Sequence, residues 1–183
     1  PTGSVEATRP RDRATPYGSA MLDRIRDSAR ANELLVDVFD FDITRVEHGE
    51  KVRLASGGEL RPVAGDAAGG TFFVCDGPVL YASSEGEAGV LAADLKAAVE
   101  LVVGVPVWHD VVANADDPKA MRAAFDEASA ELKGDEPEID ERRAEVVALL
   151  GLDEVDVDEL LARLRTSLTE LSPNYVLLNE EGD

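Results

Sequence analysis

The stretch TFFVCDGPVLYA, residues 71–82, decides the fold. It holds two short apolar runs, 71–75 and 79–82, which Asp76-Gly77-Pro78 separates. Glycine accepts the positive φ that a tight turn requires, so the two runs are expected to form an antiparallel hairpin. A third apolar run, at 60–64, precedes a glycine-rich bend and predicts another strand. Strands that follow one another without crossover helices favour an α+β fold.

Helical patterns surround these strands. Ser19 is expected to cap a first helix, and Ser84 with Glu87 has the spacing of a capping box for a helix that runs to about Val103. Residues 34–46 fit neither a helical nor a strand period, and we interpret them as a helix end that runs into an extended segment. Three more helices are expected after Asp117, over 139–150 and from Asp156 to Pro173. The sequence thus predicts a small antiparallel sheet with helices on one face, plus a C-terminal helical region.

The chain is expected to divide into four parts: a disordered arm over 1–16, an α+β core domain over 17–112, a helical extension packed on the core over 113–172, and a C-terminal tail over 173–183. Within the tail, Tyr175 to Leu178 is expected to add an edge strand or to dock onto the domain. No segment resembles a signal peptide or approaches the roughly 20 apolar residues that span a bilayer. One cysteine leaves no internal disulfide framework, which favours the cytoplasm.

The net charge of −20 is the most unusual number of the sequence. Residues 110–160 hold seventeen acidic side chains against five basic ones, a balance of −12. Such a field repels nucleic acid and anionic membranes, because phosphate contacts need Lys and Arg. It attracts a basic protein and speeds the encounter. The alternative is that the acidity only keeps the protein soluble, or reflects the genome or salt adaptation of its host.

No set of side chains forms a convincing catalytic team. The motif Ala82-x-Ser84-x-Gly86 has the small flanking residues of a hydrolase nucleophile elbow, but antiparallel strands flank it and a role as helix cap is sufficient for Ser84. Cys75 lies in an apolar strand and is expected to be a small core residue. His48 and His109 are too few for a histidine-rich metal site. We therefore expect no enzyme, no cofactor and no metal.

The block from Leu60 to Trp108 carries a resemblance to a known family. A strand ends in the bend Gly65-Asp66…Gly69-Gly70, and the strands Phe72-Phe73-Val74 and Val79-Leu80-Tyr81 and a capped helix of the type Gly89-Val90-Leu91-Ala92-Ala93-Asp94-Leu95 follow. This order resembles the SUKH superfamily, which includes cell-wall-assembly regulator-like proteins and bacterial immunity proteins. The resemblance implies a non-enzymatic α+β binding domain, and for many members the neutralisation of a toxin domain, often a nuclease. It implies no catalytic residue, and Asp66, Gly69 and Gly70 match as structural positions.

The acidic composition predicts a protein-binding domain with a basic partner, and the resemblance implies that it is a bacterial immunity protein that neutralises a toxin domain through this acidic surface. The residues expected to contact the partner are the acids Asp116, Asp117, Asp126, Glu127 and Glu131 and the apolar anchors Tyr81 and Trp108. Trp108 follows Pro106, which also favours a core position. No nucleic acid or membrane is expected as a partner, whereas a homodimer through the C-terminal helices is compatible with every reading.

Two alternatives stay open. An intracellular adaptor or scaffold would bind through an apolar groove, with the helix at 157–171 as the place to look for it. A small serine hydrolase would need Ser84 Oγ within about 3 Å of an imidazole.

Overall fold

The computed structural model describes residues 18–180 and 182, so the arm predicted over 1–16 lies outside the described residues. The helices are α1 (Ser19–Asp27), α2 (Ala29–Asp37), α3 (Leu95–Gly104), α4 (Trp108–Val111), α5 (Pro118–Asp135), α6 (Ile139–Leu150) and α7 (Val157–Thr166). Three short turns of other helix types are the 3₁₀-helices η1 (Val112–Asn114) and η3 (Ser172–Asn174) and the π-helix η2 (Ser167–Leu171). The strands are β1 (Arg53–Leu54), β2 (Arg61–Gly65), β3 (Thr71–Val74), β4 (Val79–Ala82), β5 (Ala88–Ala92) and β6 (Leu177–Leu178). The α+β prediction is confirmed.

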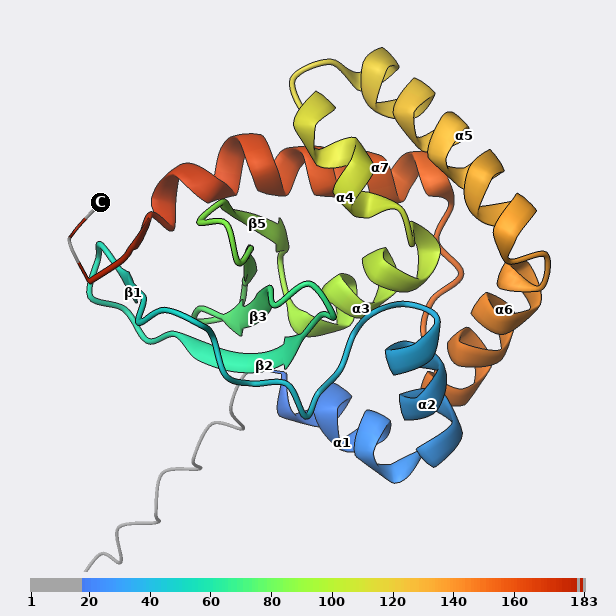
Figure 1. Ribbon diagram of the computed structural model, residues 1–183, viewed down its shortest axis with the longest axis horizontal. Helices are drawn as coiled ribbons and strands as arrows, with labels where there is room; N and C mark the ends of the chain where they lie inside the picture. Colours follow the sequence, from blue (N-terminus) through green and yellow to red (C-terminus); the bar gives the residue numbers. More distant parts are fainter. Residues whose placement is uncertain (1–17, 181, 183) are drawn as a thin grey trace, which may run out of the picture.

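Four strands form an antiparallel meander in the order β2-β3-β4-β5 (Figure 1). The predicted hairpin is β3–β4, in which Thr71 pairs with Ala82 at the open end. Its turn closes with a hydrogen bond of 2.8 Å from the Cys75 N–H to the Pro78 carbonyl. Gly77 in this turn has a φ of 129°, a value that side chains with a Cβ rarely adopt.

The two faces of the sheet enter different hydrophobic clusters. Phe72 and Val74 of β3 belong to the large cluster with the helices, whereas Phe73 and Cys75 belong to a small cluster on the opposite face. Side chains of a strand alternate in this way because successive Cβ atoms point to opposite sides. Helices therefore cover one face, as predicted, and a two-stranded ribbon of β1 and β6 accompanies the small cluster on the other (Figure 1).

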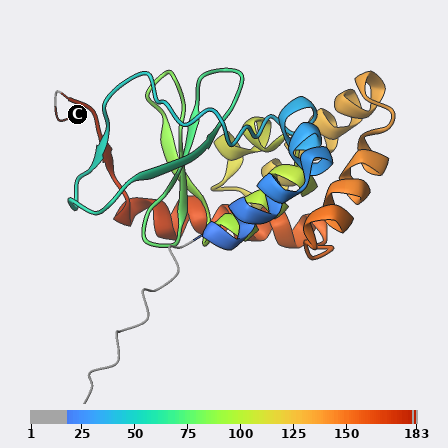
Figure 2. The same ribbon diagram turned by 90° about the horizontal axis from the view of Figure 1, so that it is seen from below.

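Helices fill the end of the molecule that is distant from the β1–β6 ribbon, and α7 runs alongside both parts (Figures 1 and 2). One hydrophobic cluster joins the sheet to the helices, because it contains Phe72 together with Met121 of α5, Val146 of α6 and Leu164 of α7. Residues 113–172 thus share their core with the α+β part. None of the described helices is both long and apolar enough to cross a membrane.

The predicted start of α5 is confirmed at the level of single atoms. Asp117 Oδ1 accepts hydrogen bonds from the backbone N–H groups of Lys119 (2.9 Å) and Ala120 (3.2 Å), and Pro118 occupies the first helical position. Proline suits that position because its missing N–H has no partner there in any case. Two further predicted helix boundaries are confirmed. Gly151 terminates α6 with a φ of 59°, and Asp156 is the N-cap of α7.

The predicted helix start at Ser84 is wrong, because residues 88–92 form β5 and pair with β4. The Ser83 hydroxyl, not that of Ser84, accepts hydrogen bonds from the N–H groups of Glu85 (3.2 Å) and Glu87 (3.0 Å) and shapes the β4–β5 turn. The capping-box spacing therefore reflects a turn. Residues 88–92 form a strand because a strand there hydrogen-bonds the backbone N–H and C=O groups along the edge of β4, which a helix would leave without partners.

Two helix caps are shifted from their predicted places. The helix after β5 begins only at Leu95, where Asp94 Oδ1 accepts from the Ala97 N–H at 2.8 Å. Ser19 is the first residue of α1 and does not cap it, because Gly18 occupies the cap position with a φ of 84° and no side-chain hydrogen bond forms.

The outer edge of β5 is covered by the turns that follow α7. The N–H of Val90 donates to Ser172 Oγ at 2.7 Å, and a Cβ on Gly89 would approach Leu168 Cδ2 to 3.0 Å. Covering an edge in this way removes unpaired backbone groups from solvent. It also places Leu168 beside β5, where it helps to line the pocket described below.

Candidate functional site

Helix α5 lies at the edge of the molecule, far from the β1–β6 ribbon (Figure 1). It buries Met121 and Phe125 against the core. The five acidic residues predicted to contact a partner, Asp116, Asp117, Asp126, Glu127 and Glu131, all lie on this helix or directly before it, and all are exposed. The structure thus gathers three of the predicted acids on α5 and the other two directly before it.

Two of these five carboxylates are used inside the protein. Asp117 is the cap of α5. Asp126 accepts from Arg122 Nε at 2.9 Å, and the same guanidinium forms an ion pair with Asp158 of α7. Arg122 therefore ties α5 to α7, and Asp126 helps to orient it.

The other three acids, Asp116, Glu127 and Glu131, make no hydrogen bond or ion pair with any described residue. Asp135, which is not among the predicted contact residues, is also exposed and has no such partner among the described residues. Glu127, Glu131 and Asp135 follow one another at intervals of four, so they lie on the same side of the helix. We call these three residues the α5 acidic face.

The α5 acidic face works against the stability of its own helix. Like charges four residues apart repel each other by about 0.2–0.5 kcal/mol per pair. Asp135 ends α5, where the negative end of the helix dipole also disfavours a carboxylate. The nearest cation in sequence, Lys133, pairs with Asp140 of α6 at 2.8 Å and leaves the face uncompensated.

Much of the remaining acidity of residues 110–160 is paired within the fold. These ion pairs are Glu136–Arg142 (3.0 Å), Glu138–Arg142 (3.0 Å), Asp140–Arg143 (2.9 Å), Glu145–Arg30 (2.8 Å) and Glu159–Arg163 (2.8 Å). Exposed pairs of this kind contribute about 0–1 kcal/mol each. Part of the acidic composition therefore has a structural role. Asp110, Glu141 and Glu154 are also exposed and unpaired among the described residues, and the α5 acidic face differs from them because its three carboxylates lie on one side of one helix.

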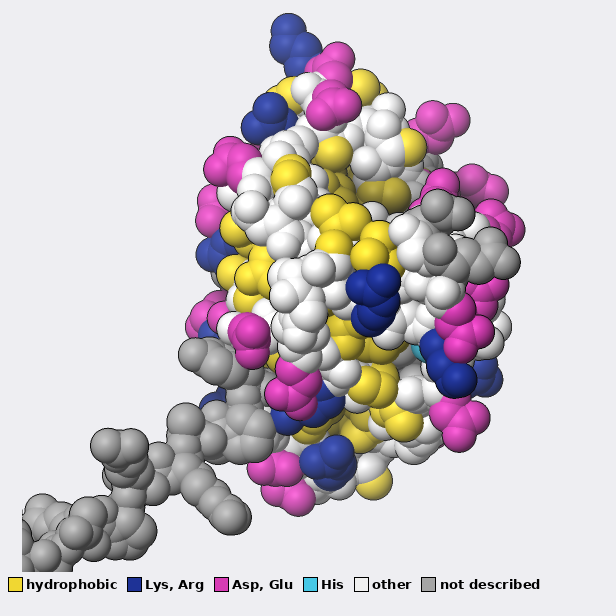
Figure 3. All heavy atoms as spheres, turned by 90° about the vertical axis from the view of Figure 1, so that its left-hand side faces the viewer, with side chains coloured by type: hydrophobic (Ala, Val, Ile, Leu, Met, Phe, Trp, Pro, Cys, Tyr) yellow, Lys and Arg dark blue, Asp and Glu magenta, His cyan; other side chains and the backbone are white. Residues whose placement is uncertain are grey.

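The face at the β1–β6 end has a different character (Figure 3). Hydrophobic side chains are visible there between scattered charges of both signs. The exposed Val176, next to β6, has 51% of its surface open to solvent. A uniform acidic coat thus does not cover the molecule.

Tyr81 and Trp108 are not exposed anchors, which corrects the sequence-based expectation. Only 8% of Tyr81 and 4% of Trp108 is accessible. Their rings meet edge to face, with centroids 4.9 Å apart, and Phe72 packs against both of them. Both rings are therefore buried in the core, which the position of Trp108 after Pro106 also favoured.

A buried carboxylate lies behind this aromatic cluster. Asp66, which is 2% exposed, accepts from the Gly70 N–H at 2.8 Å and from the Tyr81 hydroxyl at 2.5 Å. Gly70 is required here, since a Cβ would lie 2.0 Å from the Tyr81 hydroxyl. Burial and the Asp66 hydrogen bond raise the pKa of Tyr81 well above its usual range.

His109 completes the cluster at its outer side. Its ring stacks on Trp108 with centroids 3.5 Å apart, and its Nε2 lies 3.8 Å from Asp66 Oδ2. Burial lowers the pKa of His109 below its ordinary value, although the carboxylates of Asp66, Asp40 and Asp110 act in the opposite direction. This packing of His109 against Trp108 and Asp66 was not predicted, because Asp66 comes from a separate segment of the chain.

A pocket of about 330 Å³ opens between α4, η1 and β5. Its lining comprises Tyr81, Ser83, Glu87, Ala88, Gly89, Leu91, Trp108, His109, Val112, Ala113 and Leu168. We call it the α4 pocket. Its lining includes Glu87 and no lysine or arginine.

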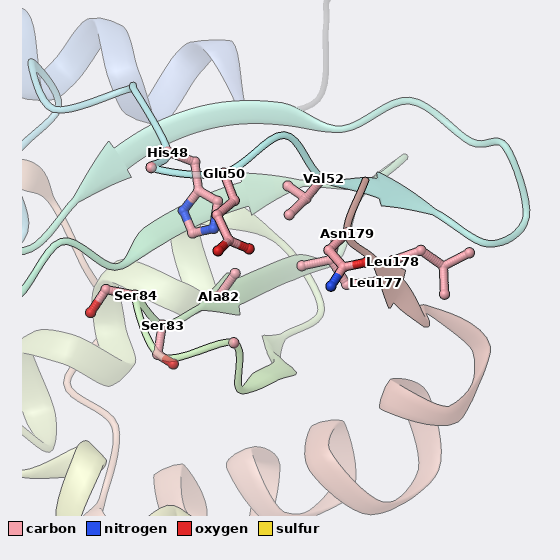
Figure 4. Close-up of a pocket in the computed structure, with 11 residues that line it drawn as sticks. His48, Glu50, Val52, Ala82, Ser83, Ser84, Leu177, Leu178 and Asn179 are labelled. Carbon is pink, nitrogen blue, oxygen red and sulfur yellow. The ribbon is translucent and has the colours of Figure 1, made fainter. Parts of the chain in front are cut away.

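Ser84 lies at a second, smaller pocket of about 120 Å³, beside the β1–β6 ribbon (Figure 4). His48 also lines this pocket, but its Nδ1 lies 3.0 Å from Thr71 Oγ1, and Figure 4 shows the Ser84 hydroxyl directed away from the His48 ring. The other histidine, His109, is next to Asp66. Neither histidine is hydrogen-bonded to Ser84 in the part of the chain that the structure describes.

A third hollow, of about 360 Å³, runs along α7. It is mostly apolar, and its lining includes Leu91 of β5, Leu101 of α3 and Leu160, Leu164 and Leu171 on the α7 side. This is the part of the molecule where the adaptor alternative places a groove.

Searches with protein-family models, against curated proteins and against solved structures each found no match to this chain.

Proposed function

We propose that the protein is a non-enzymatic protein-binding domain, an immunity-type inhibitor whose α5 acidic face receives a basic partner. The observation that carries this proposal is that three carboxylates are held on one side of a helix without a cation. Residues that break a local stability rule without compensation are the ones expected to serve a function.

The partner that fits this face is a protein with a cluster of lysines and arginines. Nuclease toxin domains have such clusters, because they bind the phosphates of nucleic acid. An acidic inhibitor that occupies the cleft excludes the substrate by charge and by volume. The strand order of residues 60–82 resembles the SUKH superfamily and supports the same class of partner, whereas the capped helix of that resemblance at 89–95 is replaced by strand β5 up to Ala92.

Inhibition of a panel of basic toxin nuclease domains tests the proposal. The wild-type protein is expected to block cleavage of nucleic acid by at least one of them, and E127Q/E131Q is expected to weaken the block. A matched control is E47Q/E59Q, which removes two exposed and unpaired glutamates from the loops around β1 and changes the net charge equally. Equal inhibition by both double variants would contradict a role of the α5 acidic face.

A second candidate function is that of an adaptor which binds through the groove along α7. The apolar lining of this groove favours it. Ala162 is exposed at the groove, so A162F is expected to obstruct it without disturbing the core. Loss of partner binding in A162F, together with normal binding by E127Q/E131Q, would replace the inhibitor proposal with the adaptor.

A further inference from the structure

We propose that the α4 pocket binds an arginine side chain of the basic partner and so supplies the anchor of the interface. This inference rests on the proposed function and deepens it. Charges at the rim of an interface mainly accelerate the encounter, whereas affinity comes from a few side chains that fill pockets. The α5 acidic face can accelerate the encounter, but Glu127, Glu131 and Asp135 line none of the three pockets described above, which a partner side chain could fill.

The walls of the α4 pocket suit the shape of an arginine. His109, whose side chain is 46% exposed, presents its ring at the pocket, and Tyr81 and Trp108 lie behind it with 8% and 4% of their surface accessible. Leu91 and the half-buried Leu168 add aliphatic carbon to the lining. A guanidinium is planar and weakly hydrated, so it stacks on aromatic rings, while its three methylene groups cover apolar surface.

The charges around the pocket favour a cation. Glu87 stands in the lining, and Asp66 lies directly behind Tyr81. Within 4 Å, the Asp66 carboxylate has His109 as its only basic neighbour among the described residues. Arg45 donates to the backbone carbonyl of Asp66 and pairs through its own side chain with Asp42, so it leaves the carboxylate uncompensated.

The hydrogen bond from Tyr81 to Asp66 strengthens this preference. A phenol that donates to a carboxylate gains electron density in its ring, and a cation is attracted by that density. The Asp66 carboxylate also acts through a medium of lower dielectric constant than water, which strengthens its attraction for a cation in the pocket.

His109 must be uncharged for a cation to enter. Burial lowers its pKa, so the ring is neutral at pH 7. The titratable groups that face it are Asp66 and Asp40 from the loops beside the sheet, Asp110 of α4, and Tyr81 of β4, with Glu87 across the pocket. Acidification that protonates His109 is therefore expected to expel the guanidinium.

The position of the pocket agrees with a single interface. Its wall of α4 and η1 leads within a few residues to Asp116, and α5 begins at Pro118. Glu127 lies ten residues from the Asp117 cap, which corresponds to about 15 Å along the helix. One partner surface can span this distance.

The test uses Nα-acetyl-arginine amide as the probe and the full chain as the receptor. The sequence contains one tryptophan, so the indole N–H signal of Trp108 in a ¹⁵N spectrum reports directly on the pocket. A saturable shift is expected with the arginine amide, and none with the citrulline amide, which has the same shape without the charge. No shift with the arginine amide, or equal shifts with both compounds, would overturn the proposal.

Two variants localise the effect. Ala113 is exposed at the mouth of the pocket, so A113L is expected to fill it and abolish the shift, while A148L on the outer side of α6 keeps it. E87Q is expected to weaken binding roughly threefold, as for an exposed charge pair. Retention of full binding in A113L would contradict the assignment.

The outcome is separable from that of the proposed function. E127Q/E131Q lies outside the pocket and is expected to bind the arginine amide as the wild type does. If the probe fails while inhibition of a nuclease still depends on the α5 acidic face, only the anchor is refuted. If the probe binds but no basic protein does, only the proposed function is refuted.

Discussion

Removal of the two central charges of the α5 acidic face should stabilise the protein. Glu127 and Glu131 repel each other across one helical turn, at a cost of about 0.2–0.5 kcal/mol. Glu131 has the same relation to Asp135, so E127Q/E131Q removes two repulsions. We expect a gain of roughly 0.5 kcal/mol, which corresponds to about 1–2 °C in Tm for a chain of this size.

The matched comparison is D117A on the same helix. Asp117 accepts two backbone hydrogen bonds as the cap, so its loss should cost about 1 kcal/mol. Urea unfolding followed by circular dichroism, at low ionic strength, measures both effects. Added salt should reduce the gain of E127Q/E131Q, because screening weakens the repulsion. If the double variant were less stable than the wild type by about 1 kcal/mol, Glu127 or Glu131 would have a partner within the fold and the repulsion would not be the dominant effect.

Three further outcomes test the core and the titrating groups. L164A should lose about 3 kcal/mol in urea unfolding, because Leu164 is fully buried in the main cluster; a loss under about 1 kcal/mol would mean that the cluster is loosely packed. Cys75 should resist thiol reagents at pH 8 until urea unfolds the chain, since burial raises its pKa to about 11; rapid labelling of the native protein would disprove this. Burial lowers the pKa of His109 in the folded state, so the unfolded chain binds the proton more readily below about pH 6.5, and the stability of the wild type should fall as the pH drops. H109Q should show a smaller decrease of its urea midpoint over the same pH range. Identical dependence of the urea midpoint on pH in the two proteins would contradict this.

The meander could be read from the sequence because its signals are local. The AspGly turn and its flanking apolar runs belong to one continuous stretch, 71–82, and the hairpin formed there. The strand at 88–92 was missed because Ser84 and Glu87 have the spacing of a capping box, which predicted a helix there, whereas the structure pairs residues 88–92 with β4. A strand was expected within Tyr175 to Leu178 and is present as β6, but its partner β1 lies more than 100 positions away and could not be identified from a local pattern.

The candidate site was predictable to a similar extent. Composition identified the acidic region, and capping rules placed α5, so the five predicted acids lie on or beside one helix. Which carboxylates are spent internally depends on long-range pairs such as Arg122 with Asp158, which the sequence does not reveal. The α4 pocket was missed for the same reason, since Leu168 and Trp108 come from segments that are sixty positions apart.

The most direct test of the account is the association rate constant with an inhibited basic nuclease domain, measured against ionic strength. Wild type and E47Q/E59Q should associate rapidly at low salt and slow steeply as salt is added. E127Q/E131Q should associate about five- to tenfold more slowly at low salt and show a shallower salt dependence. Identical rates and slopes for all three proteins would show that the carboxylates of α5 do not meet the partner.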